Sequence, residues 1–106
     1  MVDRSGKALP IFVDIDGTLT DFGQQGGNPI AGHIEKLKKL IAQGVEVIIW
    51  SGGGTDYAKK FAEDHAISGV TCIGKPSLMV DDNPNVRPVG TMVIVEPAKF
   101  FSSLSL

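Results

Sequence analysis

The chain has 106 residues, of which 42% are hydrophobic and 21% charged, with a formal net charge of −2. This length fits one domain over residues 1–106, and such apolar content at low net charge argues against disorder. The charge balance provides no overall basic surface for nucleic acid, and one cysteine excludes a disulfide framework and a cysteine-rich zinc site. Without an apolar run near the ~18 residues of a membrane span, or a signal-peptide stretch, we expect a soluble, cytoplasmic protein.

The first predicted element is a strand at Leu9–Ile15, whose apolar centre is typical of a strand buried on both faces. It ends at Asp14-Ile15-Asp16-Gly17, where two carboxylates meet a glycine. Residues 18–29 are rich in glycine and lack helical periodicity, which predicts a loop.

A helix is predicted after this loop, with Asn28 as its N-cap, Pro29 in its first turn and Gly44 as its C-terminal stop. Its apolar residues fall on one helical face, namely Ile30, Ile34, Leu37, Leu40 and Ile41. The β-branched and aromatic segment Val45–Trp50 then predicts a second buried strand.

The second strand ends at Ser51-Gly52-Gly53-Gly54, and a second helix is predicted to begin there with Thr55 or Asp56 as its cap. That helix is expected to end near residues 65–68. Three further strands are predicted at Val70–Ile73, Leu78–Val80 and Met92–Val95, followed by a short docking helix within Pro97–Leu106. Because parallel strands need crossover helices, this alternation predicts an α/β fold with a parallel sheet.

Polar residues follow the predicted strands at the edge where open parallel sheets bind their ligands. They are Asp14, Asp16, Ser51, Lys75, Asp81 and Asp82. Clustered carboxylates repel unless a cation joins them, and oxygen-only ligands favour Mg²⁺. The Ser51 hydroxyl, the N–H groups of Gly52 and Gly53 and the Lys75 ammonium suit an anion. The pattern predicts a phosphoryl pocket in which one aspartate is a nucleophile and a second transfers protons.

Four segments in order resemble the motifs of the haloacid dehalogenase (HAD) superfamily of phosphohydrolases: Asp14-Ile-Asp-Gly-Thr-Leu-Thr20, Ser51, Lys75 and Val80-Asp-Asp-Asn83. The resemblance implies an Mg²⁺-dependent phosphatase. Asp14 would be the nucleophile and a metal ligand, and Asp16 the general acid/base, with its carbonyl on the metal. Ser51 would bind the phosphoryl group, and Lys75 would neutralise it and orient Asp14. In the fourth motif Asp82 is favoured over Asp81 as the metal ligand.

The resemblance also implies a Rossmann-like three-layer domain with a five-stranded parallel sheet of order 5-4-1-2-3. Members usually carry a cap domain, whereas residues 18–29 and 66–74 are too short to form one. We therefore expect a capless member whose site is covered by a large substrate or by a neighbouring subunit of a homo-oligomer. Residues 23–28 are a candidate flap.

Two other function classes remain open from the sequence. A phospho-signalling receiver also combines acidic residues, a hydroxyl and a lysine, but its acidic pair is usually adjacent. A non-catalytic phosphate- or metal-binding regulatory protein could retain the fold. The expected partner is a phosphorylated small molecule or macromolecule, with nucleic acid only as such a substrate. Trp50 is interpreted as core or pocket wall, and His33 as a surface or helix-end residue.

Overall fold

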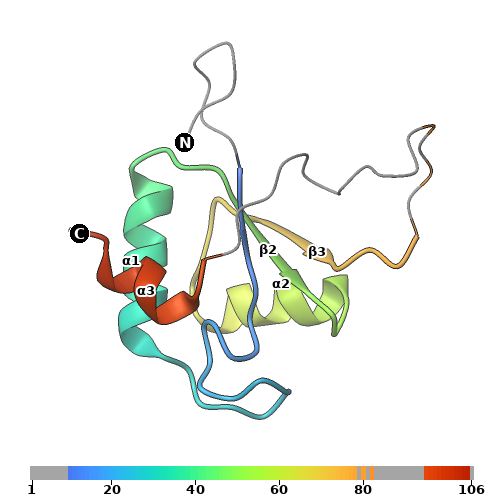
Figure 1. Cartoon of the computed structure of the whole chain (residues 1–106), viewed down its shortest axis with the longest axis horizontal. Coiled ribbons are helices and arrows are strands. Elements are labelled where there is room, and N and C mark those ends of the chain that lie inside the picture. The colour runs from blue at the N-terminus through green and yellow to red at the C-terminus, as the bar shows by residue number, and fades with distance from the viewer. Residues whose placement is uncertain (1–9, 79, 81, 83–94, 106) are drawn as a thin grey trace.

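The computed structural model describes residues 10–78, 80, 82 and 95–105. The elements follow in the order β1 (Ile11–Val13), α1 (Ala31–Ala42), β2 (Val47–Ser51), α2 (Thr55–Asp64), β3 (Thr71–Gly74) and α3 (Pro97–Ser102) (Figure 1). The three strands form a parallel sheet of order β1-β2-β3. The α/β class and this part of the predicted strand order are therefore confirmed. Within the described residues, no helix is long and apolar enough to cross a membrane.

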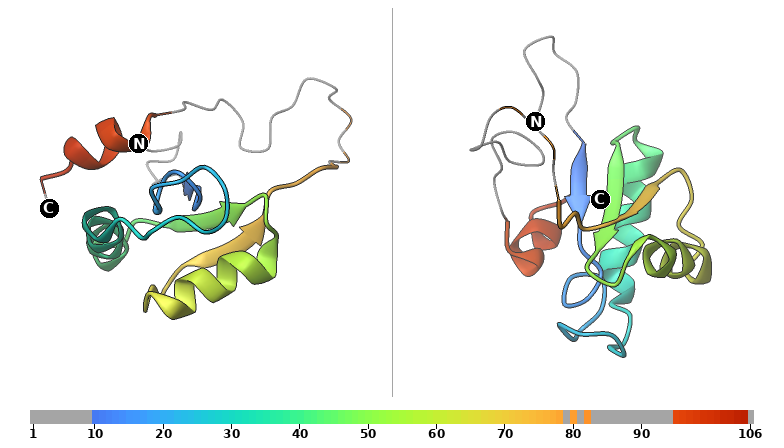
Figure 2. Two further views of the ribbon diagram at one scale, coloured as in Figure 1. Left: turned by 90° about the horizontal axis from the view of Figure 1, so that it is seen from below. Right: turned by 90° about the vertical axis from the view of Figure 1, so that its right-hand side faces the viewer.

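One face of the sheet carries the core. Val13 is paired with Ile49 across β1 and β2, and both side chains are buried. Parallel strands are joined by right-handed crossovers, and the strands lie in the order β1-β2-β3. Both connecting helices, α1 and α2, therefore lie on the same face of the sheet (Figure 2). The core residues contributed by these helices are Ile34 and Leu37 from α1 and Ala58 and Ala62 from α2.

The helix starts differ from the predicted caps. The N-cap of α1 is Ile30, with no side-chain cap. Asn28 instead binds Asp21 in the preceding loop: its side-chain amide donates to Oδ2 at 3.5 Å and its backbone N–H to Oδ1 at 2.8 Å. The N-cap of α2 is Gly54, because the Thr55 hydroxyl accepts a hydrogen bond from the Gly74 N–H at 2.9 Å. The predicted stop is confirmed, since Gly44 has a φ of +90° and its N–H donates to Ile41 O.

The predicted fourth strand is not confirmed. Leu78 and Val80 belong to no strand, and their side chains are 82% and 94% exposed. Residues 75–78, which follow β3, lead away from the sheet in Figure 1. Three apolar residues between a proline and a turn signal were too short a pattern for a strand. Residues 92–94 of the predicted fifth strand lie outside the described residues, and Val95 is not in a strand.

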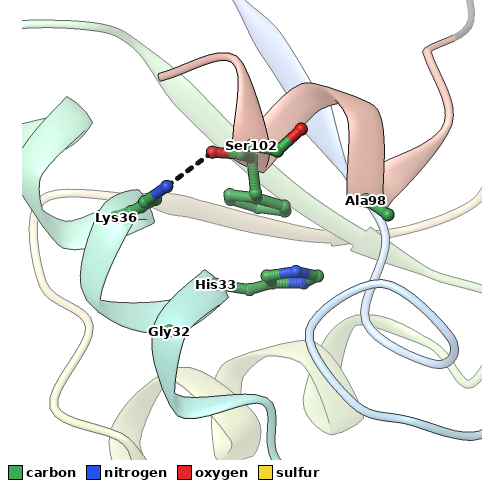
Figure 3. A pocket seen from close by; sticks show the side chains of 6 residues that line it. Gly32, His33, Lys36, Ala98 and Ser102 are labelled. Carbon is green, nitrogen blue, oxygen red and sulfur yellow. Dashed lines mark hydrogen bonds between the residues drawn. The ribbon is translucent and has the colours of Figure 1, made fainter. Parts of the chain in front are cut away.

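The short helix predicted in the C-terminal tail is present as α3, and it packs on α1. The Phe101 side chain is 2% exposed, and its ring stacks on the His33 imidazole at a centroid distance of 4.3 Å. Lys36 Nζ donates to the Phe101 carbonyl at 2.8 Å. His33 and Lys36 thus both extend from α1 toward α3, and they line a hollow of about 260 Å³ (Figure 3). His33 Nδ1 also lies 2.8 Å from the Thr18 carbonyl. We call the group of His33, Lys36 and Phe101 the α1–α3 contact.

Candidate active site

The loop after β1 is shaped by two buried side chains. Ile15 and Leu19 are both fully buried, and the Ile15 carbonyl accepts hydrogen bonds from the N–H groups of Thr18, Leu19 and Thr20 at 2.8–3.1 Å. Gly17 has a φ of +81°, a left-handed conformation that glycine adopts without steric cost. With Ile15 turned into the core, its two neighbours Asp14 and Asp16 remain half-buried at the end of β1.

Ser51 anchors the loop after β2. Its side chain is 1% exposed, its Oγ accepts from the Gly53 N–H at 3.0 Å, and its carbonyl accepts from the Gly54 N–H at 3.2 Å. The Gly53 N–H, predicted to bind an anion, is therefore bound within the loop itself. Gly52 is exposed beside it. The structure thus gives Ser51 a role in holding the loop, and its contact with a phosphoryl group stays a prediction.

The end of β3 approaches the start of α2 closely because Gly74 lacks a side chain. A Cβ at Gly74 would come within 3.1 Å of Gly54 Cα and 3.2 Å of the Thr55 nitrogen. The next residue, Lys75, donates its backbone N–H to the Ser51 carbonyl at 2.9 Å. This close approach brings Lys75 to the same edge as the two aspartates.

Lys75 and Asp14 form an ion pair across the strand ends. Lys75 Nζ lies 3.3 Å from Asp14 Oδ1, and the two side chains are 41% and 33% exposed. Lys75 Nζ also lies 5.6 Å from the centre of the Trp50 ring, which packs edge-on against Phe12. An ion pair this exposed stabilises the fold by at most about 1 kcal/mol, so its effect on chemistry matters more than its effect on stability.

Asp16 has a partner that sequence reasoning missed. The Tyr57 hydroxyl, in the first turn of α2, donates to Asp16 Oδ1 at 2.6 Å. Burial, the bond to Asp16 and the charges of Asp16 and Asp14 raise the pKa of Tyr57 to about 12. The signal in the sequence was positional, because the first turn of a helix that follows a parallel strand lies at the ligand-binding edge of the sheet. We call Asp14, Asp16, Ser51, Tyr57 and Lys75 the strand-end site.

The fourth motif does not join this site in the described part of the chain. Asp82 is exposed, and no three His, Cys, Asp or Glu side chains among the described residues group around one possible metal position. Asp81 lies outside the described residues. The donor chemistry of Asp14 and Asp16 nevertheless suits Mg²⁺, which usually takes one or two carboxylates and completes its shell with water and substrate phosphate.

A scan against protein-family models matches residues 11–75, more than half of the chain, to the haloacid dehalogenase-like hydrolases. The chain belongs to this family. The matched region runs from β1 to Lys75 and contains every residue of the strand-end site. Searches of curated proteins and of solved structures gave no match. The chain is therefore a HAD-like hydrolase whose strand-end site lies wholly within the family region.

Proposed function

We propose that this hydrolase cleaves phosphate monoesters in an Mg²⁺-dependent reaction through an aspartyl-phosphate on Asp14. The observation that carries the proposal is the 3.3 Å contact between Lys75 Nζ and Asp14 Oδ1. A phosphoryl dianion repels a carboxylate nucleophile, and a lysine beside that carboxylate offsets part of the repulsion. Both groups are partly exposed, so a substrate can reach them from solvent.

The reaction follows from the two aspartates. An Asp14 oxygen attacks phosphorus, the bond from phosphorus to the ester oxygen breaks, and the leaving oxygen takes a proton from Asp16. A water molecule then attacks the same phosphorus and gives its proton to Asp16. The bond between phosphorus and Asp14 breaks, which releases inorganic phosphate and restores the Asp14 carboxylate.

Three groups would hold Mg²⁺: the Asp14 carboxylate, the Asp16 carbonyl and the acidic fourth motif at Asp81–Asp82. When bound, the ion supplies positive charge that stabilises the negative charge on the phosphoryl oxygens. Lys75 then acts as a second positive charge and keeps Asp14 oriented. The Ser51 Oγ accepts a hydrogen bond from the Gly53 N–H. Its hydroxyl proton is then left to donate to a phosphoryl oxygen of the substrate.

The connections favour a capless enzyme. Between β1 and α1 the chain forms only a short loop, closed by the antiparallel bridge of Thr20 and Pro29 and by reciprocal bonds between Asp21 and Asn28. Between β2 and β3 it holds α2 and a turn. A substrate with a large body, or a second subunit, would then cover the site.

The test is phosphate release from an aryl phosphate by the purified chain, with Mg²⁺ and with the metal removed by EDTA. We expect turnover only with Mg²⁺, and its loss in Asp14→Asn. Asp64→Asn is the matched control, because Asp64 pairs with Lys60 on the exposed end of α2 and lies outside the site. A wild-type chain that releases no phosphate from a panel of aryl, sugar and nucleotide monoesters would overturn the proposal.

A further inference from the structure

The contact between Tyr57 and Asp16 joins two elements that are 41 residues apart in the chain. Gly53 creates the space for it: a Cβ at Gly53 would come within 2.9 Å of Tyr57 Cδ2 and 3.1 Å of Cγ. The same Cβ would lie 2.9 Å from Gln25 Nε2. The Tyr57 ring is therefore held against the loop after β2, next to a side chain from the loop after β1.

The bond distinguishes the two oxygens of the Asp16 carboxyl. Oδ1 accepts from Tyr57 at 2.6 Å, a short bond that fixes the rotation of the carboxyl group. With Oδ1 bound to Tyr57, Oδ2 is the oxygen left to carry the transferred proton in the proposed reaction. Fixing a proton donor in the reacting geometry is worth more to a reaction than the bond is worth to stability, because misplacement by about 1 Å can cost ~10²-fold in rate.

We propose that Tyr57 is a positioning residue for Asp16, which holds the carboxyl so that its free oxygen meets the leaving group. This inference rests on the proposed phosphatase reaction, in which Asp16 is the general acid and base. Tyr57 itself exchanges no proton with substrate. A phenol keeps its proton near neutral pH, so Tyr57 donates to Asp16 throughout the reaction.

The first experiment measures the contact between Tyr57 and Asp16 without relying on enzymatic activity. Tyr57 is the single tyrosine of the chain, so the near-ultraviolet absorbance of tyrosinate reports its ionisation alone. We expect a higher midpoint in the wild type than in Asp16→Asn, over the range in which circular dichroism shows the fold intact, because the Asp16 carboxylate accepts from the phenol at 2.6 Å. Equal midpoints in the wild type and in Asp16→Asn would overturn the inference.

Two glycine variants test whether packing at Gly53 affects the titration midpoint of Tyr57. Gly53→Ala pushes on the Tyr57 ring and should lower the midpoint, whereas Gly52→Ala, whose Cβ meets nothing within 4 Å, should leave it unchanged. Neither glycine has a left-handed φ, so space alone separates the two variants. Equal midpoints in both variants would contradict the packing that holds Tyr57 in place.

The second experiment tests by enzyme kinetics whether Tyr57 positions Asp16. A general acid matters most when the leaving oxygen is strongly basic, so Tyr57→Phe is compared on an alkyl and an aryl phosphate. We expect kcat/KM to fall about tenfold for the alkyl ester, part of the ~10²–10⁴-fold that a general acid supplies, and clearly less for the aryl ester. Inhibition by inorganic phosphate should stay the same. Lys60→Ala, on the exposed side of the same helix, is the control.

A double variant completes the test. Tyr57→Phe should cost nothing further in an Asp16→Asn background, because both changes act through one group. Equal losses on both esters, or full additivity with Asp16→Asn, would overturn the positioning role. If the wild type hydrolyses no ester, the proposed function fails and the positioning role fails with it, and the tyrosinate titration still shows whether the contact exists.

Discussion

The strand-end site and the α1–α3 contact both join distant parts of the chain through polar side chains, but they use these groups differently. At the α1–α3 contact, His33 and Lys36 bind backbone carbonyls around a buried Phe101 ring. At the strand-end site, ionisable side chains bind each other, and the pair of Asp14 and Lys75 stays partly exposed. The first arrangement stabilises the fold, and the second keeps charge within reach of solvent. A hollow such as that beside α3 therefore does not by itself mark the reactive region.

The largest expected effect on stability lies at the α1–α3 contact. Phe101→Ala should lower the free energy of unfolding by about 3–5 kcal/mol, the usual cost of truncating a buried phenylalanine. The measurement is urea unfolding followed by the fluorescence of Trp50, the single tryptophan. Phe101→Leu should shift stability in the same direction by less. The activity of each folded molecule should not change. A loss of kcat in Phe101→Leu would contradict a purely structural role for the α1–α3 contact.

The opposite pattern is expected at Lys75. Lys75→Met should lower kcat/KM by about 10²-fold, the typical cost of losing one charge-stabilising group, and change stability by no more than about 1 kcal/mol. Phosphate release and urea unfolding measure the two effects. Lys36→Met is the matched variant, because its ammonium binds the Phe101 carbonyl at the α1–α3 contact. It should cost about 1 kcal/mol of stability and leave kcat/KM unchanged. A loss of activity in Lys36→Met, or a loss of stability without a loss of activity in Lys75→Met, would contradict these separate roles of the two regions.

The smallest effect is a pH dependence of stability at Tyr57. Because the folded-state pKa is about 12 and the usual value is 10, the unfolded chain loses this proton first. Stability from Tyr57 is therefore full below pH 10 and declines as pH rises through about 12. Unfolding of the wild type and of Tyr57→Phe, compared at increasing alkaline pH, should show the wild type losing its advantage. A constant difference across this range would mean that Tyr57 ionises equally in both states.

Part of the fold was predictable because its signals are local. Periodic apolar residues predicted the buried face of α1, and Gly44 predicted its end. The caps were not predictable in the same way. Asn28 and Thr55 are good capping residues by type, yet the side chain of each is bound elsewhere, to the Asp21 carboxylate and to the Gly74 N–H. A short polar side chain takes whichever partner the tertiary structure brings near it.

At the strand-end site, too, some features follow from local sequence and others from tertiary packing. The sequence alone determined the order of strands and helices from β1 to β3 and placed Asp14, Ser51 and Lys75 at strand ends, because residue type and hydrophobic period are local properties of the chain. Only the tertiary structure decided which groups meet: Lys75 with Asp14, Tyr57 with Asp16, and the Gly53 N–H with Ser51. These pairings depend on strand register, on the close approach at Gly74 and on the space left at Gly53. Such distances arise only when separate elements pack together, so no local pattern encodes them.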